Sequence, residues 1–193
     1  MRDYDFFGFL ILLLNYIKTK LFFPGARIVR GGFRIRGRKG IDLGVGLTTG
    51  VGCRVECFSK TQGIAIRFGG NLQINDYVHI AAIEKVSIGN DVLIASRVFI
   101  SDHNHGDYFA ELGSDPVEPP VKRPLSSAPV IIGDNVWLGE GVCVLPGVEI
   151  GSGSIIGANA VVTKNIPANV IAVGIPAKPI KKFNSLTKTW QKL

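Results

Sequence analysis

Cysteine, histidine and acidic residues are all scarce in this chain. The three cysteines, Cys53, Cys57 and Cys143, form no Cys-x-x-Cys pair, so neither a disulfide framework nor a zinc ribbon is predicted, and a reducing, cytoplasmic compartment is favoured. Fifteen acidic residues against 22 basic ones give a net charge of +7. That surplus suits nucleic acid, an anionic membrane or a phosphate-bearing cosubstrate, and charge alone does not choose among them.

Apolar residues dominate the N-terminus without reaching the ~20 residues that a membrane span needs. Residues 6–17 (FFGFLILLLNYI) are apolar on nearly every side at helical spacing, and Lys18 and Lys20 follow directly. We therefore predict a helix within residues 1–24. Packing against its own domain or a neighbouring subunit is the favoured interpretation, and peripheral contact with the inner face of the plasma membrane is the alternative.

A period of six residues organises the rest of the chain. In the C-terminal half the repeating aliphatic positions are Ile132, Leu138, Val144, Ile150, Ile156 and Val162. The same frame occurs earlier at Phe68, Ile74, Ile80, Ile88, Ile94 and Ile100. It is interrupted twice, by a spacing of eight between Ile80 and Ile88 and by a long insertion after Ile100.

Six is neither a helical period nor a simple strand alternation. It indicates a short extended piece, a corner, and repetition, with one aliphatic side chain pointing inward near each corner. Glycine directly after the repeating aliphatic residue, as at Gly133 and Gly139, suits a corner that needs a positive φ or lacks room for a side chain. Three such sides form a coil of 18 residues, and stacked coils form a solenoid of parallel strands ~4.8 Å apart.

The insertion, about residues 101–129, begins with SDHNHG and ends in a proline-rich arm. Long ordered loops in compact domains commonly carry function. A neutral histidine ring accepts a proton from a substrate hydroxyl near neutral pH, which makes His103 and His105 candidates for a general base. The remaining histidine, His79, lies between two inward positions and is expected to face outward.

Together with the histidine insertion, the segments NVWLG, LPGVEIG, GANAVVTK and GIPAKPI resemble the acetyl-CoA-dependent O-acetyltransferases with hexapeptide repeats. This group includes the galactoside, maltose and nodulation-factor enzymes, and the wording of SDHNHG is most similar to the surface-polysaccharide (O-antigen and capsule) members. The resemblance implies an all-β, left-handed parallel β-helix with a short N-terminal helix, one long inserted loop and a short C-terminal helix. The expected domains are 1–24, 25–176 with the loop at 101–129, and a basic tail or helix at 177–193.

The resemblance also implies roles for individual residues. His103 matches the catalytic histidine, with His105 as the second candidate. The expected contacts to the cosubstrate are Trp137 beside the thioester, backbone N–H groups at Gly139 and Ala158, and Lys164, Lys178 and Lys181 near the CoA phosphates. Asn75 and Asp102 are expected on the substrate side. Asp102 or a main-chain carbonyl is also expected to fix the tautomer of His103, and Ile83 replaces an acceptor-binding carboxylate of the galactoside enzymes.

The function that this resemblance implies is transfer of acetyl from acetyl-CoA to a saccharide hydroxyl. The acceptor is expected to be a bacterial envelope polysaccharide or its lipid-linked or nucleotide-sugar precursor. A homotrimer with active sites between subunits, no metal and no nucleic-acid partner are expected. The alternatives are an acetyltransferase for a small acceptor (free sugar, serine or antibiotic), a non-catalytic solenoid, and a zinc hydrolyase using His79, His103 and His105, whose spacing does not favour a metal.

Overall fold

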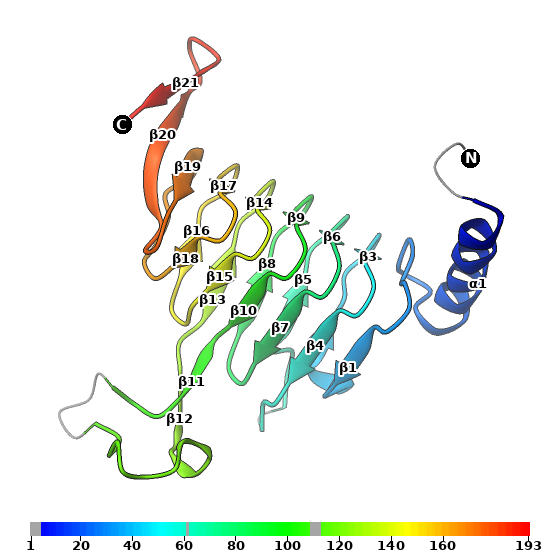
Figure 1. Ribbon diagram of the computed structural model, residues 1–193, viewed down its shortest axis with the longest axis horizontal. Helices are drawn as coiled ribbons and strands as arrows, with labels where there is room; N and C mark the ends of the chain where they lie inside the picture. The colour runs from blue at the N-terminus through cyan, green and yellow to red at the C-terminus, as the bar shows by residue number, and fades with distance from the viewer. Residues whose placement is uncertain (1–4, 61, 109–112) are drawn as a thin grey trace.

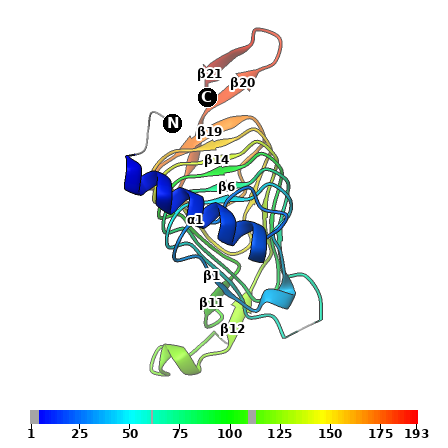
Figure 2. The same ribbon diagram turned by 90° about the vertical axis from the view of Figure 1, so that its right-hand side faces the viewer.

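The structure is a computed structural model that describes residues 5–60, 62–108 and 113–193. Its body is a stack of short strands (Figure 1). Helix α1 (Phe6–Phe22) lies across one end, and a hairpin of β20 (Lys178–Asn184) and β21 (Thr189–Lys192) projects from the other. In the view along the stack, the coils lie behind one another with α1 in front (Figure 2).

Three parallel sheets, visited by the chain in turn, make up the coil. Sheet B contains β1 (Arg34–Arg36), β4 (Arg54–Cys57), β7 (His79–Ala82), β10 (Phe99–Ser101), β15 (Cys143–Val144) and β18 (Val161–Val162). Sheet C contains β2 (Ile41–Asp42), β5 (Ile66–Phe68), β8 (Val86–Ile88), β13 (Val130–Ile132) and β16 (Glu149–Ile150). Sheet A contains β3 (Thr48–Thr49), β6 (Gln73–Ile74), β9 (Leu93–Ile94), β14 (Trp137–Leu138), β17 (Ile155–Ile156) and β19 (Val170–Val173), with β20 and β21 added antiparallel. Two short 3-10 turns, η1 (Arg38–Gly40) and η2 (Pro120–Lys122), lie outside these sheets.

The predicted aliphatic positions form the core. Residues with the same place in the repeat lie directly above one another, so that Ile74 pairs with Ile94, Ile94 with Leu138, and Leu138 with Ile156. The six predicted positions of the C-terminal half are all at most 2% exposed. Burial of each such side chain contributes about 1.5–3 kcal/mol, and the repeat supplies one on every side of every coil.

The glycines that follow the core positions are explained by lack of space. A Cβ on Gly139 would lie 2.6 Å from the backbone nitrogen of Ala158 in the next coil. The positive φ angles fall two residues further on, at Asn135 (56°) and Gly141 (69°). Of the two explanations offered by the sequence, close approach of the next coil therefore applies at Gly139, and the left-handed conformation belongs to the residue two places later.

The insertion leaves the coil between β10 of sheet B and β13 of sheet C. It contains β11 (His103–His105), which pairs antiparallel with β12 (Leu125–Ser127). These two strands form the stem of an arm that extends away from the coil (Figure 1). Residues 109–112 of the predicted loop lie outside the described residues.

The ends of the chain agree with the sequence at one terminus only. The N-terminal helix is present as α1, whereas the expected C-terminal helix is wrong, because residues 178–192 form the β20–β21 hairpin. This hairpin extends sheet A through pairing of β20 with β19 and carries Phe183 against Trp190, with ring centroids 5.3 Å apart. The basic tail is therefore a pair of strands joined by a turn, and it has no helical face.

Helix α1 contacts the coil through the buried side chain of Thr19. Its hydroxyl donates to the carbonyl of Asn15 (2.6 Å) and accepts from the backbone N–H of Val29 (2.8 Å), and it is the buried residue of the helix. Most of the apolar side chains point to solvent, with Phe6 77% and Leu14 58% exposed. Across the described part of the chain, no helix is long and apolar enough to cross a membrane.

Candidate active site

Asp102, the first residue of the arm, has a fully buried carboxylate. It accepts hydrogen bonds from the backbone N–H groups of Ile83 (3.0 and 3.2 Å), Glu84 (2.8 Å) and Lys85 (2.7 Å). These three amides belong to the turn between β7 and β8, where the sequence spacing is eight and not six. The two extra residues thus form a loop that binds this carboxylate.

His103 is held by Asp102. Its Nδ1 lies 2.8 Å from Oδ1 of Asp102 and 3.3 Å from the hydroxyl oxygen of Ser101. Because a carboxylate only accepts, Nδ1 is the donor, and in the neutral ring Nε2 then has its lone pair available. Among the described residues nothing hydrogen-bonds to Nε2. This is the arrangement of a positioned general base: one nitrogen oriented by an acid, the other ready to take a proton.

Two small residues and one aromatic ring lie near His103. Ala81 and Ser101 are paired neighbours on β7 and β10, and both are buried even though they point outward from sheet B. Phe58 meets the His103 ring edge-on, with centroids 6.3 Å apart. The guanidinium of Arg36 lies over the ring of Phe58, 5.5 Å from the ring centroid. Phe58 was not found from the sequence, since it lies before the first predicted position of the repeat, Phe68.

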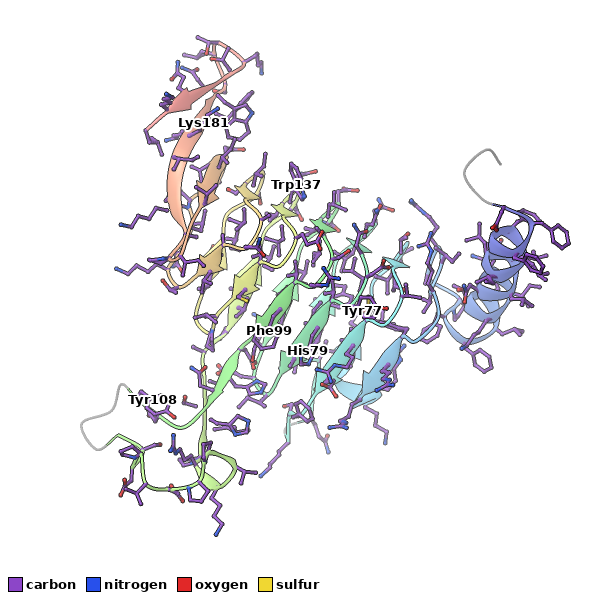
Figure 3. The ribbon with its side chains drawn as sticks, viewed as in Figure 1. Tyr77, His79, Phe99, Tyr108, Trp137 and Lys181 are labelled. Atoms are coloured by element: carbon purple, nitrogen blue, oxygen red, sulfur yellow. The ribbon has the colours of Figure 1, made fainter. Side chains whose placement is uncertain are left out.

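His79 lies on the outer face of sheet B, as expected, beside Phe99 (Figure 3). Its Nε2 is 2.9 Å from a carboxylate oxygen of Glu56, and its Nδ1 is 3.0 Å from Nη2 of Arg54. Burial, and next the charge of Arg54, lower the pKa of His79, which favours the neutral ring. The neutral ring donates from Nε2 to Glu56 and accepts at Nδ1 from Arg54, so neither nitrogen is left to act as a base.

His105, the second candidate base, is exposed near the end of β11, and its backbone carbonyl accepts from the hydroxyl of Tyr108 (2.6 Å). The described residues provide no hydrogen bond to its ring and no carboxylate that orients it. His105 therefore lacks the orientation that His103 has. It lies on the same side of β11 as His103, because side chains two residues apart on a strand share a face.

The root of the arm is attached to the coil by contacts that the sequence did not reveal. The hydroxyl of Ser127 on β12 donates to a carboxylate oxygen of Glu84 (2.7 Å), and the backbone N–H of Ala128 donates to the carbonyl of Asp102 (2.9 Å). Glu84 thus contributes both its amide to Asp102 and its side chain to β12. The only signal for it is the eight-residue spacing.

The expected substrate-side role of Asp102 is not supported by its surroundings. Its side chain has no exposed surface, and its oxygens are occupied by three amides and His103. The alternative, that it fixes the tautomer of His103, agrees with the geometry. The physical reason is that amide donors satisfy the carboxylate in place of water.

Residues expected to contact the cosubstrate lie on sheet A. Trp137 on β14 points outward and is 48% exposed, with Leu93 and Ile155 beside it on the paired strands (Figure 3). The N–H of Gly139 donates to the carbonyl of Ile156 (2.8 Å) within the coil, and its expected contact with the cosubstrate stays a prediction. The N–H of Ala158 has no acceptor within the described ranges.

The three lysines expected near the CoA phosphates lie at the C-terminal end of the stack. Lys164 follows β18 and is exposed, while Lys178 and Lys181 both lie on β20. Figure 3 shows Lys181 on the projecting hairpin, beyond the level of Trp137. Within residues 5–60, 62–108 and 113–193, none of the three forms an ion pair with a carboxylate.

Asn75 and His103 lie at opposite ends of the strands of sheet B. Asn75 precedes β7 at the corner between sheets A and B, half-buried, with its side-chain oxygen 3.5 Å from Nε2 of Gln73. His103 follows β10 at the corner between sheets B and C. A single chain therefore brings His103, Asp102 and His105 together, and it separates them from Asn75, Trp137 and Ala158.

The histidines do not gather as a metal site. No cluster of three or more His, Cys, Asp or Glu side chains that could hold a metal ion occurs in the described part of the chain.

Known proteins are similar to this chain both in its repeat and over nearly its full length. Residues 129–164 match the family model described as "Bacterial transferase hexapeptide (six repeats)". The chain is 48% identical, over 192 residues, to the putative lipopolysaccharide biosynthesis O-acetyl transferase WbbJ of Escherichia coli strain K12, covering 99% of this chain and 96% of that protein. It is 38% identical over 128 residues to the galactoside O-acetyltransferase of the same strain, covering 65% of this chain and 58% of that enzyme.

A solved structure supports the same relationship. The maltose O-acetyltransferase from Clostridium difficile 630 superposes with a TM-score of 0.57 at 32% identity, over 77% of this chain and 73% of that one.

Proposed function

Since the chain belongs to the hexapeptide-repeat acetyltransferase family, we propose that it transfers acetyl from acetyl-CoA to a hydroxyl of a bacterial envelope saccharide, with His103 as the general base. The relative that matches nearly the full length of the chain is a putative lipopolysaccharide O-acetyl transferase, which supports an envelope acceptor. The observation that carries the assignment of the base is the orientation of His103 by the buried Asp102, with no hydrogen bond to Nε2 from the residues that the structure describes.

In the proposed reaction, His103 Nε2 takes the proton of the acceptor hydroxyl while the hydroxyl oxygen attacks the thioester carbonyl. The carbon–sulfur bond then breaks, and His103 returns the proton to the leaving thiolate. Asp102 stabilises the imidazolium between the two transfers and keeps the ring in place. No covalent bond to the protein is needed, because the two substrates react directly once they are aligned.

The residues on sheet A fit acetyl-CoA. Trp137 offers an exposed ring on sheet A; in the described residues the backbone N–H of Ala158 has no acceptor, and Lys164, Lys178 and Lys181 are cations without acidic partners. Residues 150–193 contain no Asp or Glu, so nothing in that segment offsets these charges. A cosubstrate with a pyrophosphate and a ribose phosphate matches this composition.

We further propose that the active site forms between subunits of a homotrimer. Support comes from the separation described above. His103 follows the end of a strand of sheet B, whereas Asn75 precedes the start of one and Trp137 lies on sheet A. One chain alone therefore does not bring the proposed base and the proposed cosubstrate contacts together. A closed threefold arrangement places one edge of each subunit against the other edge of the next. Sedimentation of the intact chain as a trimer is the expected result.

Two features of the fold belong to the same proposal. We take the coil to be left-handed, as the family resemblance implies, although general crossover rules favour the opposite hand. We also take residues 25–176 as the acetyltransferase domain, with residues 1–24 and 177–193 as appendages. Helix α1, with its exposed apolar side chains and the basic residues Lys18 and Lys20, is proposed to contact the cytoplasmic face of the membrane peripherally.

The test of the function is mass spectrometry of envelope polysaccharide from cells with and without this chain. The expected result is a glycan that loses one acetyl group when the chain is absent and regains it when the wild-type chain, but not the His103→Ala variant, is restored. An unchanged glycan in the deletion strain would overturn the envelope acceptor.

A further inference from the structure

The outer face of sheet B carries an unusual row of basic side chains that leads toward His103. Arg34 on β1 lies directly opposite Arg54 on β4, and Arg54 lies opposite His79 on β7. His79 in turn lies opposite Phe99 on β10, the strand that ends next to Asp102 and His103. The row therefore runs from the α1 end of the coil to the candidate base.

The pairing of Arg34 with Arg54 is electrostatically unfavourable by itself. Neighbouring strands bring directly paired side chains to within ~5 Å, and like charges so placed destabilise a sheet. In the described ranges, neither arginine forms an ion pair with a carboxylate. Both are exposed. An anion bound between them would remove this repulsion, which is why we regard the pair as a binding feature.

Arg54 is also held in position. Its Nη2 donates to Nδ1 of His79, and Nε2 of His79 contacts Glu56 at 2.9 Å. Glu56 itself is only 3.7 Å from Nε of Arg36, the arginine that covers Phe58 beside His103. The neutral ring of His79 thus orients Arg54 without neutralising its charge, and the single acidic side chain of the group is occupied by His79 and Arg36.

We propose that Arg34 and Arg54, with Arg36 at their side, bind the diphosphate that links the acceptor sugar to its carrier. This inference rests on the proposed function and narrows its acceptor to a carrier-linked sugar. Guanidinium groups bind phosphate oxygens in pairs, and two arginines on adjacent strands suit two adjacent phosphates. Two strand spacings, ~10 Å, separate Arg54 from the level of Phe99. A sugar joined to the diphosphate would lie in that interval, over His79 and Phe99, with a hydroxyl directed to His103.

A sugar diphosphate has two sources, a lipid-linked carrier and a nucleotide. The row itself recognises only what they share. The test therefore uses three acceptors with the same hexose: the free sugar, the sugar joined through diphosphate to uridine, and the sugar joined through diphosphate to farnesol. Release of the CoA thiol is measured with the full-length chain for the wild type, Arg34→Gln, Arg54→Gln and, as a matched control, Arg67→Gln. Arg67 is an exposed arginine on sheet C, paired with Asp42.

The expected result is that both row variants lower kcat/KM for the diphosphate-linked sugars at least tenfold more than for the free sugar, mainly through KM, while Arg67→Gln behaves as wild type. Preference for the farnesyl or the uridine compound identifies the carrier, and either supports the proposal. Equal losses on all acceptors, or no loss on the linked sugars, would overturn it.

A binding measurement separates this proposal from the proposed function. Titration calorimetry with inorganic pyrophosphate, on the chain saturated with CoA so that the proposed cosubstrate site is filled, should show binding to the wild type and to Arg67→Gln, weakened at least tenfold in Arg34→Gln. If no sugar is acetylated but pyrophosphate binds in this pattern, the anion site stands and the function fails. If sugars are acetylated but pyrophosphate binds all four proteins equally, or none of them, the anion site is wrong and the function stands.

Discussion

His103 and Asp102 are neighbours in sequence whose side chains also meet, with Nδ1 of the histidine 2.8 Å from Oδ1 of the aspartate. Neighbouring side chains on an extended strand normally point to opposite faces. Here Asp102 lies at the corner between β10 and β11, where the chain changes direction and the alternation is broken. Position at a corner, more than residue type, is what makes this pair.

Removal of the base should abolish most of the activity. His103→Ala is expected to lower kcat at least ~100-fold, because no other described side chain with a free basic nitrogen is oriented at that place. Binding of CoA, measured by calorimetry, should stay near the wild-type value, since the proposed cosubstrate contacts lie on sheet A. His105→Ala serves as the comparison and should cost much less. Similar losses in both variants would mean that the base is misassigned.

Asp102 is proposed to position His103 and should act through it. Asp102→Asn replaces one of the two accepting oxygens with an NH2 donor, which faces at least one backbone N–H group whichever way the amide lies, so we expect a loss of about 1–3 kcal/mol in unfolding free energy. We also expect a fall in kcat of at least ~10-fold with little change in KM, because the ring is no longer held in its tautomer. Denaturant unfolding and the pH profile of kcat check the two effects. A stability loss with an unaltered pH profile would indicate a purely structural role.

His79 should make the coil sensitive to acid. Its pKa is lowered in the folded chain below the ordinary 6.5, so folding favours the neutral ring. The stabilisation is complete above the unfolded pKa and is lost as pH falls through 6.5 toward the lowered folded value, because the unfolded chain binds the proton first. The melting temperature should therefore fall more between pH 7.5 and 5 in wild type than in His79→Gln. His105→Gln, an exposed histidine, should retain the wild-type dependence.

Glycine at the corner of the coil should be required for stacking. Gly139→Ala places a Cβ 2.6 Å from the backbone nitrogen of Ala158, and relief of this contact requires the two coils to separate. We expect a loss of about 1–3 kcal/mol in unfolding free energy. Gly31→Ala is the matched control, since its Cβ would meet a side-chain carbon of Val51 at 3.9 Å, an ordinary contact. Equal stability of the two variants would contradict the packing argument.

Helix α1 should bind anionic lipid. Leu10 and Leu14 are 43% and 58% exposed and lie one turn apart on the helix surface, so Leu10→Glu with Leu14→Glu should leave the coil folded. The double variant is expected to lose at least ~10-fold in affinity for vesicles that contain phosphatidylglycerol, because apolar burial and charge attraction both fall. Flotation with vesicles checks this. Leu186→Glu, on the loop of the C-terminal hairpin, is the control; wild-type binding by the α1 variant would exclude this surface.

The repeat could be predicted from the sequence because every period has the same physical cause. An aliphatic residue such as Leu138 or Ile156 is needed wherever a side of the coil meets the core, so periodicity and burial coincide. The arm and His103 were found as the place where this periodicity stops. The family resemblance, and not the period, supplied the role of the histidine.

Other parts of the site depend on contacts between segments that no local pattern records. The amides that bind Asp102 come from residues 83–85, and the eight-residue spacing showed an irregularity there without its purpose. The C-terminal hairpin was mistaken for a helix because Lys178–Asn184 is basic and mixed in polarity. Its strand character comes from pairing with β19, which the segment alone does not reveal.

The contacts of Asp102 separate a root of the arm that is fixed to the coil from a tip whose sequence is free to vary. The proposed general base is held by the coil and by the root of the arm, through the amides of residues 83–85, the pairing of β11 with β12 and the bond from Ala128, whereas residues 113–124 form no hydrogen bond or ion pair with Asp102 or His103. The tip, residues 113–124, can therefore be exchanged without displacing His103 or Asp102. For protein engineering, that tip is the natural position for a loop graft that leaves the proposed base in place.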